Sequence, residues 1–384
     1  MFSKKAKIVH HWRLLLLVIL LAAIISLFVN RGPPHEDDDL KNPLKDIPED
    51  PFHGKPPPTG RFLYQILSAG GVGHTVADYN WGLTESLRYN LTKVHLPIKC
   101  GHDIGFDCED FFDAGVDTVY SMEEINLATR MGLLKRVRIH GLATYPKMAE
   151  TMAAHPEDNI VINITETTST CDYTTSRDWW RNRLARASQS PFWHKKFSAP
   201  KYSKEAINVA LHIRRGDIIP TVGLPPAVRY TTNQFYIDVF RSIQRVFPPG
   251  VKVVGHFISE GEPADYQDIA DTFPEHKILL HGKSLDDFLL LKEADVIVAA
   301  KSGYSHLAAS LSDAMVIALP FWCPFHYFPS VIMADENLRG FNMSDFVRVW
   351  NERPEGLRKG VKAMMPSVDG LPASPKPSAP LKKT

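Results

Sequence analysis

The segment INVALHIRRGD at residues 207–217 decides how the second half of the chain is read. Its first seven residues are mostly apolar or β-branched, which predicts a buried strand. Arg214 and Arg215 follow directly, with Gly216 allowing the chain to turn, so two permanent positive charges stand at the end of that strand. A pair of guanidinium groups in this place matches the oxygens of a phosphate.

The sequence after this segment predicts a regular alternation of strands and helices. Apolar runs predict further strands, helical spacing predicts helices between them, and Ser284 with Asp287 has the spacing of a capping box. Such alternation indicates a mostly parallel sheet covered by helices on both faces. The predicted strands are 207–213, 251–259, 277–280, 295–300 and 315–320, and the predicted helices are 233–247, 263–273, 284–294 and 302–314.

The first half of the chain predicts a second α/β lobe, with less detail. A strand at 61–67 leads through the glycine loop GGVGH at 70–74 into a helix from about residue 75 to 90. A further strand is predicted at 159–164 and a helix with a basic face at 178–188. We therefore expect an N-terminal lobe over 61–204 on the acceptor side, and a C-terminal, Rossmann-like donor lobe over 205–360.

Candidate binding residues gather at two predicted strand ends. Ligands bind at the carboxyl ends of the strands in open parallel sheets. KSGYS at 301–305 directly follows a predicted strand, as the paired arginines do. Ser302 can cap a helix whose first turn presents free N–H groups, and Tyr304 and Ser305 add hydroxyls. Together these groups describe a diphosphate cradle. If each motif is considered alone, there is an alternative to phosphate binding. For the paired arginines it is an ion pair with Asp217, and for Ser302 it is an ordinary helix cap.

The glycine loop and the acidic residues give weaker signals. Gly71 and Gly73 lie between a strand and a helix, where the backbone can approach a ligand, but the third glycine of a dinucleotide fingerprint is missing. Acidic residues cluster at 37–39 and 286–287, and neither cluster resembles a set of metal ligands. We therefore expect cationic stabilisation of a diphosphate without a metal.

The N-terminus predicts a membrane anchor. Basic residues precede an apolar run at 14–30 and acidic residues follow it, which favours a cytoplasmic tail at 1–13 and a lumenal body. A cleaved signal peptide is the alternative. Residues 31–60 are rich in proline and acid, which predicts an extended stem, and 361–384 predict a disordered tail. The short span suits the Golgi or ER membrane, and the net charge of +1 gives no reason to expect nucleic-acid binding.

Four cysteines and three glycosylation sequons agree with a lumenal body. The four cysteines allow three pairings if all are bridged. Cys100 and Cys108 are close enough for a local disulfide, and a buried thiol is the alternative for Cys323, which lies in an apolar stretch. The sequons begin at Asn90, Asn163 and Asn342.

HIRRGD at 212–217 resembles the H-x-R-R-x-D signature shared by the α1,2-, α1,6- and protein O-fucosyltransferases, and most resembles the α1,2 branch. The segment 294–319 and GGVGH are similar to that branch's later motif and glycine-rich loop. The resemblance implies a GT-B-like fold of two Rossmann-like lobes with a donor-binding cleft between them. It also implies GDP-fucose as donor, inversion at the sugar carbon, a glycan or glycoprotein acceptor, and no required metal.

The same resemblance implies roles for individual residues. Arg214 would bind the β-phosphate and stabilise the departing GDP, with His212 and Arg215 in support. Asp217 would hold the loop or touch the nucleotide, while Ser302, Tyr304 and Ser305 would line the pocket. His74, Ile218 and the sequence Lys301-Ser302-Gly303 depart from the family's usual residues.

Several alternatives stay open at this stage. The catalytic base is one of His74, Asp78, Asp217 and Glu260, all near predicted strand ends. A metal-independent GT-B transferase with another nucleotide sugar is the alternative enzyme. A catalytically silent lumenal glycan-binding protein of the same fold is the alternative of a different class.

Overall fold

The computed structural model describes residues 50–68, 70–101, 104–105, 107–141, 145–198, 201–216, 218, 229–325, 330–336 and 340–357. The expected anchor, most of the expected stem and the C-terminal tail lie outside these residues. None of the helices in the described ranges is both long and apolar enough to cross a membrane.

The described part of the first lobe contains a four-stranded parallel sheet with the order β2-β1-β4-β3. Its strands are β1 (Arg61–Gln65), β2 (Thr92–Lys93), β3 (Lys135–Ile139) and β4 (Ile160–Ile164). The helices of this part are α2 (Val72–Tyr89), α3 (Asp107–Phe112), α4 (Met122–Arg130), α5 (Tyr145–Ala154), α6 (Arg177–Ala187) and α7 (Pro191–Lys196). The expectation of a second α/β lobe is therefore confirmed.

The second lobe is a seven-stranded sheet, counted over the described residues, with the order β11-β10-β9-β8-β5-β6-β7. All neighbouring pairs are parallel except β10 with β11. Its strands are β5 (Ile207–Ile213), β6 (Val253–Ser259), β7 (Lys277–Leu280), β8 (Val296–Ala299), β9 (Met315–Ala318), β10 (Val331–Asp335) and β11 (Gly340–Phe341). Numbered from β5, the run from β7 to β10 reads 3-2-1-4-5-6, the order of a dinucleotide-binding Rossmann sheet.

Helices cover both faces of this sheet. They are α8 (Asn233–Val246), α9 (Gln267–Thr272), α10 (Ser284–Lys292), α11 (Gly303–Leu311) and α12 (Met343–Glu352), with short 3-10 turns at Pro263–Tyr266 and Glu355–Leu357. Alternate residues of β5 explain the two layers, because successive strand side chains point to opposite faces. Val209 and Leu211 are buried with side chains of α8 and α12, whereas Ala210 is buried with those of α10 and α11.

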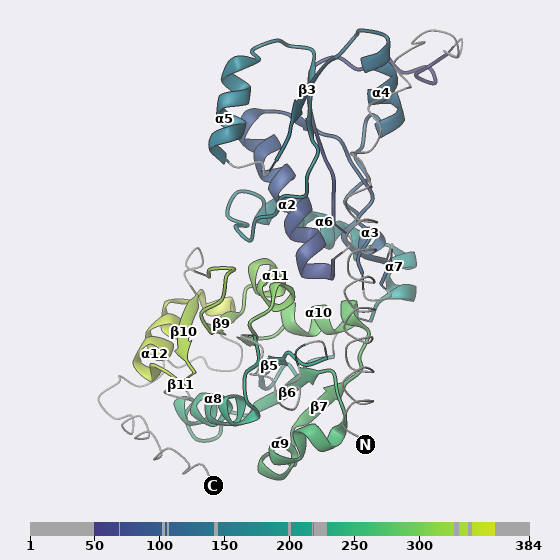
Figure 1. The fold of residues 1–384 in the computed structure, drawn as a ribbon. Helices are drawn as coiled ribbons and strands as arrows, with labels where there is room; N and C mark the ends of the chain where they lie inside the picture. Colours follow the sequence, from purple (N-terminus) through teal and green to yellow (C-terminus); the bar gives the residue numbers. More distant parts are fainter. Residues whose placement is uncertain are drawn as a thin grey trace, which may run out of the picture.

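The two lobes share one buried apolar cluster. It joins residues of α2, α3, α6 and α7 to residues of α10 and α11, and Figure 1 shows α2 and α11 meeting where the lobes join. A Cβ on Gly73 would lie 2.3 Å from the backbone carbon of Gly303, so the first turns of α2 and α11 touch backbone to backbone. The two-lobed α/β fold that was expected is confirmed.

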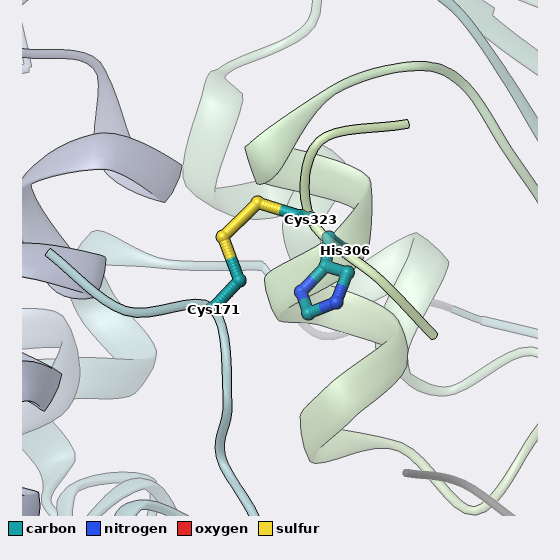
Figure 2. Close-up of side chains that lie close together, drawn as sticks. All are labelled: Cys171, His306 and Cys323. Carbon is teal, nitrogen blue, oxygen red and sulfur yellow. A yellow bond between two sulfur atoms is a disulfide. The ribbon is translucent and has the colours of Figure 1, made fainter. Parts of the chain in front are cut away.

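Two details of the sequence interpretation are wrong. Cys323 is not a buried thiol: it forms a disulfide with Cys171, beside the His306 ring of α11 (Figure 2), and Cys100 pairs with Cys108 as expected. The apparent capping box of α10 is also absent, because Lys283 occupies the N-cap and Ser284 is already helical. The apolar stretch around Cys323 therefore surrounds a disulfide-bonded cysteine, whose partner lies 152 residues away in the sequence.

Candidate functional site

A cavity of about 450 Å³ opens between the lobes at the carboxyl ends of the second sheet. The start of α2 and Ile104 line it from the first lobe. The second lobe contributes residues at or just beyond the ends of four of its strands, and Trp322 from the loop after β9. These residues are His212 and Ile213 at the end of β5, Arg214 and Arg215 after it, Ile258 and Ser259 at the end of β6, Glu260 after it, Gly282, Ser284 and Asp287 after β7, and Ser302, Gly303 and Tyr304 after β8, with Arg229 and Trp322 beside them.

The centre of this cavity is the switch point of the sheet. Strand order reverses between β5 and β8, which are direct neighbours, and a crevice forms outside two adjacent strands whose connections leave in opposite directions. Arg214 follows one of these strands and Ser302 follows the other. The structure therefore brings these two strand ends together at one cavity.

Arg214 lies at the crevice and is bonded to the start of α11. Its Nη1 donates a hydrogen bond to Ser302 Oγ at 3.0 Å, and the side chain lines the cavity. Gly216 turns the chain immediately afterwards with φ of +71°, a backbone conformation that glycine adopts without strain. A Cβ there would also lie 2.1 Å from Glu260 Oε2. The glycine therefore lets the arginine loop pass close to the end of β6.

Arg215 has a different environment, although it is the next residue. Its side chain is buried, Nη1 donates to the carbonyl of Arg214 at 2.8 Å, and Nη2 donates to Asn233 Oδ1 at 2.7 Å. Asn233 in turn donates to Asp268 Oδ1 at 2.9 Å, and the Tyr230 ring lies 4.5 Å from the guanidinium. Arg215 therefore holds the loop in place, and Arg214 presents its charge to the cavity.

The start of α11 supplies the second part of the candidate anion site. Ser302 is fully buried, caps the helix, and its Oγ accepts from the Tyr304 N–H at 3.3 Å. The Tyr304 hydroxyl donates to the carbonyl of Ser284, tying the start of α11 to α10. Ser305 is not brought to the cavity, because its hydroxyl donates to carbonyls within its own turn, those of Ala300 and Ser302. Its predicted place in the binding pocket is not supported by this geometry.

The glycine loop brings a second helix start to the same place. Gly71 is the N-cap of α2 in extended conformation, and both Gly71 and Gly73 line the cavity. Because Gly73 touches Gly303, the first turns of α2 and α11 converge on one space. Each helix start carries a partial positive charge from its free N–H groups. The glycine at 73 is thus required for the contact between the helices.

His212 lies beneath these groups as a neutral ring. Burial and then the charge of Arg214 lower the pKa of His212 to about 3, and its ring packs 5.3 Å from that of Tyr304, centroid to centroid. Its Nδ1 has no hydrogen-bond partner among the described residues. A neutral imidazole there keeps a second positive charge away from Arg214 and packs against the wall of the cavity.

An acidic side of the cavity was missed as a binding surface by the sequence analysis. Glu260 directly follows β6, and Asp287 lies in the first turn of α10. Burial, followed by the charges of Asp286 and Glu260, raises the pKa of Asp287 to about 7. The signal in the sequence was the position of Asp286 and Asp287 just after a predicted strand, which was interpreted as a helix cap.

The four candidate bases separate in the structure. His74 and Glu260 line the cavity, whereas Asp78 is buried one turn behind His74 and accepts a hydrogen bond from the Ser68 N–H at 2.9 Å. The distance from His74 Nε2 to Asp78 Oδ1 is 3.9 Å, and half of the His74 side chain is exposed. Asp217, which was also predicted to be catalytic, lies outside the described residues.

No protein-family model matches this chain, and no curated protein does either. Solved structures do resemble it. POFUT1 in complex with GDP-fucose has 13% identity and a TM-score of 0.41, over 66% of this chain and 95% of that one. A variant of Arabidopsis thaliana FUT1 in complex with GDP has 13% identity and a TM-score of 0.38, over 81% and 80%. Fucosyltransferase NodZ from Bradyrhizobium has 13% identity and a TM-score of 0.36, over 66% and 94%.

Proposed function

We propose that this protein is a glycosyltransferase that uses GDP-fucose and transfers fucose to a glycan or glycoprotein with inversion, without a required metal. The observation that carries the proposal is the meeting of Arg214 with the start of α11 at the switch point of a Rossmann-ordered sheet. The choice of GDP-fucose rests in addition on the resemblance of HIRRGD to the fucosyltransferase signature.

The diphosphate occupies the centre of the cavity in this proposal. An arginine fork and two helix starts together supply positive charge and N–H donors, which stabilise phosphate oxygens and the extra charge of a leaving diphosphate. These groups replace what a divalent cation supplies in metal-dependent transferases. Arg214 contacts the β-phosphate, and Ser302 holds the guanidinium at the distance given above.

The nucleoside lies on the side of β6 and β7. Glu260 directly follows the second strand of the Rossmann order, the place from which an acidic residue accepts hydrogen bonds from ribose hydroxyls in related sheets. Asp287 lies farther along the same side and can accept from N–H groups of a guanine ring, which uracil presents in a different pattern. This arrangement supports a preference for GDP over UDP.

The acceptor side lies toward the loop after β9. Trp322 lines the cavity there with 53% of its surface exposed, and the Cys171–Cys323 disulfide anchors the next residue to the first lobe. An exposed indole presents a flat apolar face against which the face of a sugar ring can pack. We assign Trp322 to the acceptor.

His74 is the proposed general base. The acceptor hydroxyl oxygen forms a bond to the anomeric carbon, the bond from that carbon to the β-phosphate oxygen breaks, and GDP leaves with the electron pair. The hydroxyl proton passes to His74, whose Nε2 lies 3.9 Å from Asp78 Oδ1. Glu260 is placed on the nucleoside side and is less suited to this step.

The membrane part of the proposal rests on sequence. The apolar run at 14–30 with its flanking charges supports a single-pass type II protein whose catalytic body faces the Golgi or ER lumen. The α1,2 branch is the proposed family branch, on the motif alone.

The full chain, purified in detergent, tests the proposed function directly. It is incubated with GDP-fucose, GDP-mannose, UDP-galactose and UDP-N-acetylglucosamine, with a mixed glycan acceptor, and products are identified by mass spectrometry and NMR. Fucosylated product with inverted configuration, formed equally in excess chelator, supports the proposal. Transfer from a UDP-sugar favours the alternative enzyme, tight GDP binding without turnover favours the silent binding protein, and activity restored only by manganese contradicts the metal-free site.

A further inference from the structure

A second cavity, of about 180 Å³, lies within the first lobe. Its walls come from α2, β2, the loop between α3 and α4, and α6. Helix α2 reaches both cavities: Val72 lines the donor cavity, and Tyr79, Leu83 and Ser86 line this one. At a rise of ~1.5 Å per residue, Ser86 lies ~20 Å along the helix from Val72. The second cavity is therefore separate from the proposed chemistry.

Three side chains that line it each have a buried polar atom with no hydrogen-bond partner among the described residues. These atoms are Lys93 Nζ, Ser86 Oγ and Arg183 Nη1. The Lys93 amine lies 3.9 Å from the centroid of the Tyr79 ring, a cation–π contact that satisfies none of its N–H donors. Buried polar groups in folded proteins are nearly always paired, so three unpaired ones around the same cavity indicate that something else completes them.

The neighbouring charged side chains of this cavity each have a charged partner, although Arg183 Nη1 makes no hydrogen bond within the described residues. Arg183 forms an ion pair with Asp117 and lies over the Trp179 ring. Glu109 is the carboxylate whose charge acts on Lys93. It accepts hydrogen bonds from the N–H groups of Ile98 at 2.8 Å and Gly115 at 2.9 Å, and it lies 3.2 Å from His95 Nε2. Lys93 is thus the cation in this group that lacks an oxygen partner within the described residues.

The state of this amine agrees with an incomplete site. Burial lowers the pKa of Lys93 to about 7, against the opposing effect of Glu109. A carboxylate placed next to the amine would favour its charged form and be held by it.

The walls and mouth of the cavity are apolar and aromatic. Tyr79 and Trp179 stack with their centroids 6.1 Å apart, and Tyr120 also lines the space. At the mouth, Leu87 and Val119 are 47% and 57% exposed, unusual for large apolar side chains. A ligand that covered them would bury these side chains and could also supply the hydrogen-bond acceptor that Lys93 Nζ lacks among the described residues.

We propose that this cavity binds a carboxylate carried on a six-membered ring, with the carboxylate on Lys93 Nζ, a further polar group on Ser86 Oγ, and the ring against Tyr79 and Trp179. Two sources share this chemistry: an acidic sugar within a glycan, and a free aromatic acid. The site would hold a ligand in the first lobe while the donor cavity performs transfer, and it does not depend on the donor assignment.

Calorimetric titration of the full chain tests this site with four probes: sodium glucuronate, sodium benzoate, inorganic phosphate and glucose. Binding of glucuronate or benzoate, with glucose and phosphate much weaker, supports the proposal, and the stronger of the two acids identifies the source. Phosphate binding as tightly as either acid, or no binding by both acids, overturns it.

Three variants locate the binding. Lys93→Met keeps the length of the side chain and should lower the affinity for the acid by about tenfold or more. Lys204→Met, at an exposed lysine, should leave this affinity unchanged. Leu87→Glu places a like charge at the mouth without touching the buried groups, so it tests the site even if Lys93→Met folds poorly. Unchanged affinity in Lys93→Met and Leu87→Glu, or affinity lost in Arg214→Ala, overturns the assignment.

Discussion

Arg214 Nη1 donates a hydrogen bond to Ser302 Oγ at 3.0 Å, joining the ends of β5 and β8, the two neighbouring strands between which the order of the sheet reverses. The bond fixes a guanidinium beside the free N–H groups of α11. It therefore sets in advance the geometry that a diphosphate needs, and the cost of ordering a long side chain is met during folding.

Arg215 and Arg214 should differ sharply in what they do. Because Arg215 is buried and bonded to Asn233, Arg215→Ala should lower the free energy of unfolding by about 2 kcal/mol. Urea denaturation measures this, and Arg214→Ala should change stability much less. A destabilised Arg214→Ala with an unaffected Arg215→Ala would reverse the two roles.

His74→Ala should lower kcat about 100-fold with little change in the KM for the donor, since proton removal is lost and donor contacts remain. Steady-state kinetics with added imidazole should restore part of the rate. His194→Ala, at an exposed histidine of α7, is the matched control. Full activity in His74→Ala would assign the proton transfer to another group.

Asp287 should make the protein less stable as pH rises. Its pKa of about 7 in the folded state lies above its ordinary value, so the folded protein holds a proton that the unfolded chain has released. The stabilising contribution is complete below about pH 4 and is lost as pH rises through about pH 7. The Tm of Asp287→Asn, relative to wild type, should therefore rise between about pH 5 and about pH 8. A constant difference would show that Asp287 ionises normally.

Gly73→Ala should disturb the junction of the lobes. The added Cβ meets the backbone of Gly303, which cannot move as a flexible side chain can, and a loss of about 2 kcal/mol in unfolding free energy is expected. Gly356→Ala has open space around it and serves as the control. Equal stability of the two variants in urea would mean that α2 and α11 separate easily.

The second lobe was predictable because its central strands are buried on both faces and have continuous apolar sequences. β5 to β9 were all expected close to their observed bounds, and HIRRGD fell at the switch point. β3 was not expected, because KRVRI carries three basic residues on an edge strand whose outer side chains stay in solvent. Charged edge strands give little hydrophobic signal.

The site was half predictable for a related reason. Motif residues next to strand ends could be placed from the chain alone, whereas the roles of Arg214 and Arg215 depend on which way each side chain turns. Asp287 enters the cavity only because α10 begins at Ser284, with the cap at Lys283. The pairing of Cys171 with Cys323 depends on how the two lobes meet, which local sequence does not encode.

Calorimetric titration of GDP into wild-type and Arg214→Ala protein tests the central claim most directly, with guanosine as the phosphate-free comparison. If Arg214 binds the diphosphate, GDP affinity falls about 100-fold in the variant, while guanosine binds both proteins equally. GDP binding with the same affinity to both proteins would contradict the account.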